Sequence, residues 1–124
     1  MAAPNIVNVA TITGKTATVA LSSTNATAVV SNAASSSKVF KINNILVSNV
    51  DPVNAADITI NIYSQDDIAG TAYAIASTIS VPADSTLIVL DKNTALYLEE
   101  DKSIGAVASA VDDLVVVASY EEIS

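Results

Sequence analysis

The sequence predicts an all-β protein: a single-domain, two-sheet β-sandwich or jelly roll of about 8–10 short antiparallel strands. Three observations lead to this fold class. Apolar and polar residues alternate with a period of two wherever the pattern is clear. Turn-forming residues separate the alternating stretches at short intervals. The 124 residues are enough for one domain, and one Phe and no Trp predict a thin core of small and β-branched side chains.

The N-terminal part predicts a hairpin. Two alternating stretches, NVATI and TATVAL, flank Gly14-Lys15, and glycine suits a two-residue turn that needs positive φ. A weaker strand follows at 26–30, and a Ser/Ala-rich loop covers 31–38.

A bulged strand is predicted in the next stretch, 38–50. Its apolar residues are even-numbered up to Ile42 and odd-numbered from Ile45. This change of phase predicts a β-bulge at Asn43-Asn44, because one extra residue moves every later side chain to the opposite face.

The two clearest strands are predicted at 56–63 and 73–81. In the first, alternate isoleucines from Ile58 onward share one face, which directs Tyr63 outward. In the second, Tyr73 and Ile75 are expected to face the core together with Val81.

The remaining strands follow a turn at 82–84, where proline fixes φ and Asp84 can bond to its own backbone. They are expected at 86–91, 95–98, 103–109 and 113–120. Two runs are apolar on both faces, so they should be buried between layers or covered by a neighbouring subunit. These candidate interface residues are Leu87, Ile88, Val89, Leu90, Leu114, Val115, Val116 and Val117.

Charge is divided unequally along the chain, whose net charge is −8. Residues 1–50 contain Lys15, Lys38 and Lys41 and no acid, whereas all thirteen acidic residues follow. We therefore divide the chain into a basic, Ser/Thr/Ala-rich N-terminal hairpin or arm, 1–37, and an acidic β-sandwich body, 38–124, within one folded unit. The three lysines are candidate contacts with an acidic neighbour. The alternative for the N-terminal part is an ordinary edge hairpin of the sandwich.

Composition excludes several kinds of chemistry. Without His or Cys, no Ser-His-Asp or Cys-His nucleophile can form, so we expect no enzyme and no catalytic residues. Three scattered glycines argue against a phosphate-binding loop, and the acidic balance argues against nucleic acid. No segment resembles a membrane span or cleaved signal, which predicts synthesis in a cytoplasm without export by a cleaved signal.

Any bound metal would have to use carboxylates. Oxygen ligands suit Ca²⁺ or Mg²⁺, but no acidic run has the spacing of a calcium loop. Neighbouring acids on a strand also point to opposite faces. We therefore expect no metal and no cofactor. The candidates considered were Asp51, Asp57, Asp66, Asp67, Glu99, Glu100, Asp101, Asp112 and Asp113.

Residues 38–124 resemble a family of small all-β virion structural proteins of marine bacteriophages and cyanophages. The resemblance rests on the ordered series KVFKINNILVSNVD, ADITINIY and ISVPADSTLIVLDKNTALYLEEDKSIGAVASAVDDLVVVASYEEI. One departure is that Asp101 follows Glu99-Glu100 where relatives often have glycine, which predicts a turn without positive φ. The family has no catalytic residues to transfer, so the resemblance implies that these acids cap a turn after 95–98.

The resemblance implies a virion structural protein of the head, neck or tail, and the function we expect is that of a capsid decoration, or cement, protein that stabilises the head lattice without catalysis. Its expected partners are the major capsid protein and copies of itself, as a homo-oligomer such as a trimer, with no nucleic acid and no membrane. Its expected location is the virion, on the capsid surface. The alternative is a neck, tail or fibre-associated β module that contacts a host surface or other tail proteins.

Overall fold

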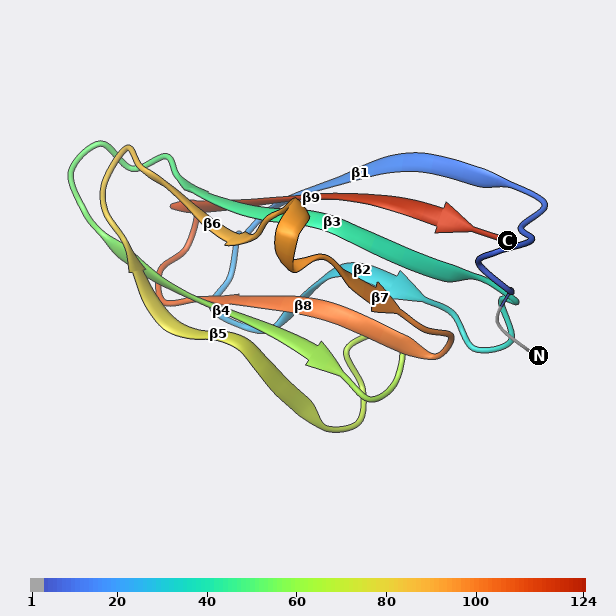
Figure 1. Ribbon diagram of the computed structural model, residues 1–124. Coiled ribbons are helices and arrows are strands. Elements are labelled where there is room, and N and C mark those ends of the chain that lie inside the picture. Colours follow the sequence, from blue (N-terminus) through green and yellow to red (C-terminus); the bar gives the residue numbers. More distant parts are fainter. Residues whose placement is uncertain (1–3) are drawn as a thin grey trace.

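Two antiparallel sheets lie face to face in the computed structural model, which describes residues 4–124 (Figure 1). Sheet I has the order β1-β9-β3-β6, with β7 also paired to β3. Its strands are β1 (Ile12–Ala20), β3 (Val39–Asn49), β6 (Thr86–Leu90), β7 (Leu96–Leu98) and β9 (Leu114–Ile123). The two-sheet β-sandwich predicted from the sequence is therefore confirmed.

Sheet II has the order β2-β8-β4-β5. Its strands are β2 (Thr27–Asn32), β4 (Ala56–Tyr63), β5 (Ala72–Val81) and β8 (Lys102–Ala108). A single 3₁₀ turn, η1 (Lys92–Thr94), connects β6 to β7. Asp91 begins this turn, since its side chain accepts hydrogen bonds from the backbone N–H groups of Asn93 and Thr94. Residues 4–124 include no helix with the length and apolarity needed to cross a membrane.

The core lies between the sheets and consists mainly of aliphatic and β-branched side chains. Sheet I contributes inward residues that alternate along β3 and β9, and sheet II contributes those of β4 and β8. At about 25 cal/mol for each Å² of apolar surface, these side chains are the main stabilising contribution. The fully buried members include Ile42, Ile45, Val47, Ile58, Ile60, Ile104, Leu114 and Val116.

Two buried asparagines join the sheets to each other. Asn49, in β3, donates hydrogen bonds of 2.9 Å from Nδ2 to the carbonyl oxygens of Asn54 and Val81, the last residue of β5. Asn32, in β2, donates in the same way, at 3.0 Å, to the carbonyls of Lys38 and Leu98. Because buried amides need such partners, these bonds also determine how the sheets align.

The hairpin predicted around Gly14-Lys15 is wrong. Both residues lie inside β1, which pairs with β9 from Ile12 to Ala20 without a register shift. Gly14 does not have positive φ. The long partner strand explains the difference, because nine residues paired with β9 form far more hydrogen bonds than a two-residue turn allows.

The bulge predicted at Asn43-Asn44 is confirmed. The register of β3 against β9 shifts between Ile42 and Asn44. The shift allows Ile42 and Ile45 both to reach the core, where each is fully buried. As a consequence, Leu46 points to the outer face of sheet I.

Candidate functional site

The outer face of sheet I carries a group of apolar side chains that the core does not contain. Val117 in β9 is paired with Leu46 in β3, and Leu46 is paired with Ile88 in β6. Val115 lies two residues from Val117 and therefore on the same face. Ile88 is 62% exposed and the other three are partly exposed. We call these four residues the outer patch.

No charged side chain interrupts the outer patch. Its strand neighbours on the same face are Thr18, Ala20, Ser48, Thr86 and Ser119. The charged residues of these strands on this face are Lys41 and Glu121, which are paired with each other beyond the bulge. For a chain of net charge −8, an uncharged apolar face is a feature that favours contact with a partner.

The structure separates the predicted interface residues into two groups. Leu90, Leu114 and Val116 are buried in the core, and Leu87 and Val89 pack against it. Ile88, Val115 and Val117 point outward instead. The runs are apolar on both faces because one face builds the core and the other builds the outer patch. The sequence analysis did not include Leu46 among the interface residues. The predicted bulge nevertheless implies its direction, because Ile45 and Val47 face the core and the residue between them faces outward.

Two of the three candidate lysines are engaged within the chain. Lys15 Nζ lies 2.8 Å from a carboxylate oxygen of Glu122, and Lys38 Nζ contacts the other oxygen. The hydrogen bonds from Lys15 and Lys38 lower the pKa of Glu122, and the same carboxylate raises the pKa of Lys15. Lys15 therefore ties β1 to β9, and Lys38 ties the residue before β3 to β9. Lys41 remains on the outer face.

The acidic turn at 99–101 connects β7 to β8. Its last residue, Asp101, has a φ of 58°, so the expectation of a turn without positive φ is wrong. Aspartate adopts this conformation, which is otherwise typical of glycine, more readily than most residues because its side chain is short and polar. Here the Oδ1 atom of Asp101 accepts a 3.2 Å hydrogen bond from the backbone N–H of Asp66. The acid thus connects two loops.

A second acidic region lies at the opposite end of the sandwich. Asp51 Oδ1 accepts hydrogen bonds from the N–H groups of Val53 (2.7 Å) and Asn54 (3.1 Å), which lower the pKa of Asp51. Desolvation and the negative charge of Asp51 raise the pKa of Asp113. Within residues 4–124, no three carboxylates form a group suited to a metal ion. The hydrogen bonds to Asp51 therefore stabilise the loop that follows this residue.

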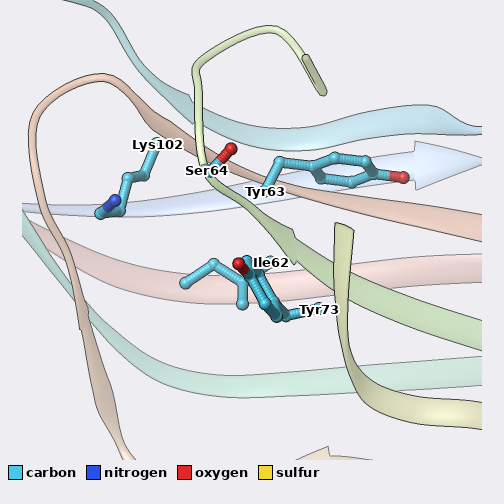
Figure 2. Close-up of a pocket in the computed structure, with 5 residues that line it drawn as sticks. All are labelled: Ile62, Tyr63, Ser64, Tyr73 and Lys102. Atoms are coloured by element: carbon cyan, nitrogen blue, oxygen red, sulfur yellow. The ribbon is translucent and has the colours of Figure 1, made fainter. Parts of the chain in front are cut away.

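A shallow, open depression of about 300 Å³ lies at one end of sheet II. Its lining residues are Ile62, Tyr63, Ser64, Tyr73 and Lys102. Figure 2 shows the ring of Tyr73 beside the Ile62 side chain, whereas the ring of Tyr63 points away from Lys102. The depression contains no pair of groups placed for acid–base chemistry.

Of the two tyrosines of this region, Tyr73 differs from the sequence expectation and Tyr63 lies on the expected face. Tyr73, expected in the core, is paired with Ile62 but is 60% exposed, because it lies near the end of β5, an edge strand with a neighbour on one side only. Tyr63 points to the outer face but is only 7% exposed. The loop 64–71 covers it, since Ile68 and the Tyr63 ring both lie over Gly105.

Comparisons with known proteins identify the fold. No family model matches the chain, and no curated protein matches it. A solved structure described as "Bacillus endospore appendages form a novel family of disulfide-linked pili" is similar, with a TM-score of 0.53 and 13% identity over 92% of this chain and 88% of that one. The infectious bursal disease virus Gx strain gives a TM-score of 0.27 and 14% identity over 90% and 42% of the two chains. The first similarity supports the sandwich fold.

Proposed function

We propose that this chain is a non-catalytic structural subunit, and specifically a capsid decoration protein that binds the head of a phage through the outer patch. The observation that carries the proposal is the uncharged apolar face of sheet I, formed by Leu46, Ile88, Val115 and Val117. A decoration protein needs a surface of this kind, because it must fold in solution and then bind a lattice.

The absence of His and Cys supports the proposal. The sequence contains no His and no Cys, and the acids whose contacts are described above close turns or bind lysines. The family resemblance of residues 38–124 points to the same class of protein. Since the chain has no cysteine, it cannot form disulfide bonds with its neighbours in an assembly.

The alternative is a neck, tail or fibre-associated module, and the exposed tyrosines favour it. Tyr73 and Tyr97 are 60% and 46% exposed, and exposed aromatic rings commonly contact glycans or proteins. Tyr73 also borders the depression next to Lys102. Tyr73 lies on sheet II, whereas Tyr97 is paired with Lys41 and lies on the outer face of sheet I, beyond the bulge. The two functions therefore predict different contact surfaces at sheet II, where Tyr73 lies far from the outer patch.

The test is immunogold electron microscopy of intact virions with an antibody to this protein. Label spread over the head is expected for decoration. Label confined to the neck or tail would contradict decoration and favour the alternative.

A matched pair of variants locates the contact. Ile88→Asp places a charge in the outer patch and should remove the protein from heads without unfolding it, because the residue is already exposed. Ile79→Asp places the same charge on sheet II, at a residue 40% exposed, and should leave head binding unchanged. Equal binding by both variants would exclude the outer patch as the attachment surface.

A further inference from the structure

The edge strand β1 has hydrogen-bonding capacity that the described chain does not use. It pairs with β9 along one side, and no other strand of residues 4–124 pairs with its other side. The pairing runs over nine residues without a bulge. The strand is therefore long and regular, which are the properties of a template for another strand.

The hydrogen bonds to β9 determine which backbone groups of β1 are free. Thr11 exchanges two bonds with Ser124, and the N–H of Leu21 donates to the carbonyl of Leu114. In a regular antiparallel pair such bonds recur at every second residue, so the odd-numbered residues of β1 face β9. The N–H and C=O groups of the even-numbered residues face outward: Ile12, Gly14, Thr16, Thr18 and Ala20.

The other edges are protected against pairing. On β5, the register against β4 shifts twice, and Thr78 has a φ of 50°. On β2, the register shifts between Ala28 and Val30. The strands β6 and β7 have only five and three residues. Bulges and short lengths are the usual protection of sheet edges, and β1 has neither.

We propose that β1 pairs with β1 of a second copy of this chain, antiparallel and with Thr16 opposite Thr16. Within residues 4–124, β1 is the only edge strand that is both long and regular. The strand that matches it in length is therefore β1 of a second copy. In this register the outward-facing groups of both strands meet. Each pair of facing residues exchanges two hydrogen bonds, and sheet I continues from one copy into the next.

The side chains fit this register. Thr16 faces Thr16, a favourable cross-strand pair, and Gly14 faces Thr18. Ile12, which is 54% exposed, faces Ala20 of the second copy. Lys15 faces Ala17, so no like charges lie directly opposite, and the Lys15 amine is bound to Glu122 of its own chain.

Charge also favours a second copy at this edge. Residues 1–50 contain no acid, so pairing through β1 joins the acid-free parts of two chains that each have a net charge of −8. The outer patches then lie on the same side of the extended sheet, where two copies could bind a lattice together. The dimer does not depend on the proposed capsid attachment.

The experiment uses cysteine crosslinking, because the natural chain has no cysteine. Thr16→Cys should form a disulfide-linked dimer under mild oxidation, since residues that face each other are about 5.5 Å apart at Cα. Thr18→Cys is the matched control on the same strand and face, and it should stay uncrosslinked because it faces Gly14. Gly14→Cys mixed with Thr18→Cys should crosslink, and a Cβ at Gly14 meets no atom within 4 Å.

Sedimentation of the unmodified chain completes the test. We expect a dimer, and we expect Thr16→Pro to raise the dissociation constant at least about tenfold while retaining the far-UV spectrum, since its lost N–H is not bonded to β9. A monomer throughout the micromolar range would overturn the proposal, even if the outer patch binds heads. Equal crosslinking by Thr16→Cys and Thr18→Cys would also overturn it.

Discussion

The outer faces of the two sheets differ in what covers them. On sheet II, the loop 64–71 covers one end of the outer face, and Tyr63 and Ser103 are buried beneath it. On sheet I, the outer patch has no such cover, and Ile88 is 62% exposed. The comparison teaches that outward apolar residues have two different roles here: those of sheet II stabilise the fold, and those of sheet I are free to contact a partner.

The largest loss of stability is expected from removing the hydrogen bonds by which Asn49 joins the two sheets. Asn49→Ala removes hydrogen bonds to the carbonyls of Asn54 and Val81 and from the N–H of Asp51. Buried groups left without partners should lower the free energy of unfolding by about 3 kcal/mol. Urea denaturation measures this, with the exposed Asn93→Ala as control. A loss below about 1 kcal/mol would contradict the role of Asn49.

Two glycines test the contrast between covered and uncovered sheets. A Cβ at Gly105 would lie 2.7 Å from Ile68 Cγ2 and 2.9 Å from Tyr63 Cε1. Gly105→Ala should therefore displace the covering loop and destabilise the protein by about 2 kcal/mol. Gly14→Ala in β1 meets no atom within 4 Å and should change stability by less than about 0.5 kcal/mol. Thermal unfolding compares them, and equal effects would contradict the packing described for sheet II.

A smaller effect is expected from the hydroxyl that holds the loop. Ser103 Oγ donates to the carbonyl of Gln65 and accepts from the N–H of Ile68, both at 2.8 Å. Ser103→Ala should cost about 1 kcal/mol and speed amide hydrogen exchange in 64–71. Ser119→Ala, on the outer face of sheet I, is the control and should leave this exchange unchanged. Unchanged exchange in Ser103→Ala would show that the loop is held by other contacts.

The smallest effect is the pH dependence of the stability that Glu122 contributes. Because the lysines lower the pKa of Glu122 in the folded state, its contribution to stability is present above its ordinary value of 4.5 and is lost as pH falls through the lowered value. Glu122→Gln should cost about 1 kcal/mol at neutral pH, and less below that range. Subtracting the two urea profiles removes the opposite contribution of Asp113, whose pKa is raised. A difference that does not change with pH would contradict the ion-pair interpretation.

Much of the fold could be predicted because alternation is a local signal. The strand β4 was expected at 56–63 and is found there, and the phase change in β3 located the bulge. The hairpin was wrong because glycine in a strand resembles glycine in a turn until its partner strand is known. The burial expected for Tyr73 was wrong because it depends on the place of β5 at the edge of its sheet. Tyr63 lies on the expected outer face, but alternation does not predict the loop that buries it.

The candidate site could be predicted only in part. Ile88, Val115 and Val117 were among the expected interface residues, but so were Leu90, Leu114 and Val116, which belong to the core. A run that is apolar on both faces does not say which face is inside. That depends on pairing between strands far apart in the chain, such as Leu46 with Val117.

The sequence by itself determined that this protein is built from strands and has neither the His nor the Cys that Ser-His-Asp and Cys-His nucleophiles require. Both follow from local alternation and from the absence of His and Cys. Only the tertiary structure decided that Lys15 and Lys38 share Glu122, that β1 is an open edge and that four apolar residues form one outer patch. The physical reason is that side-chain direction along a strand is a local property, whereas contacts arise when distant strands are brought into register.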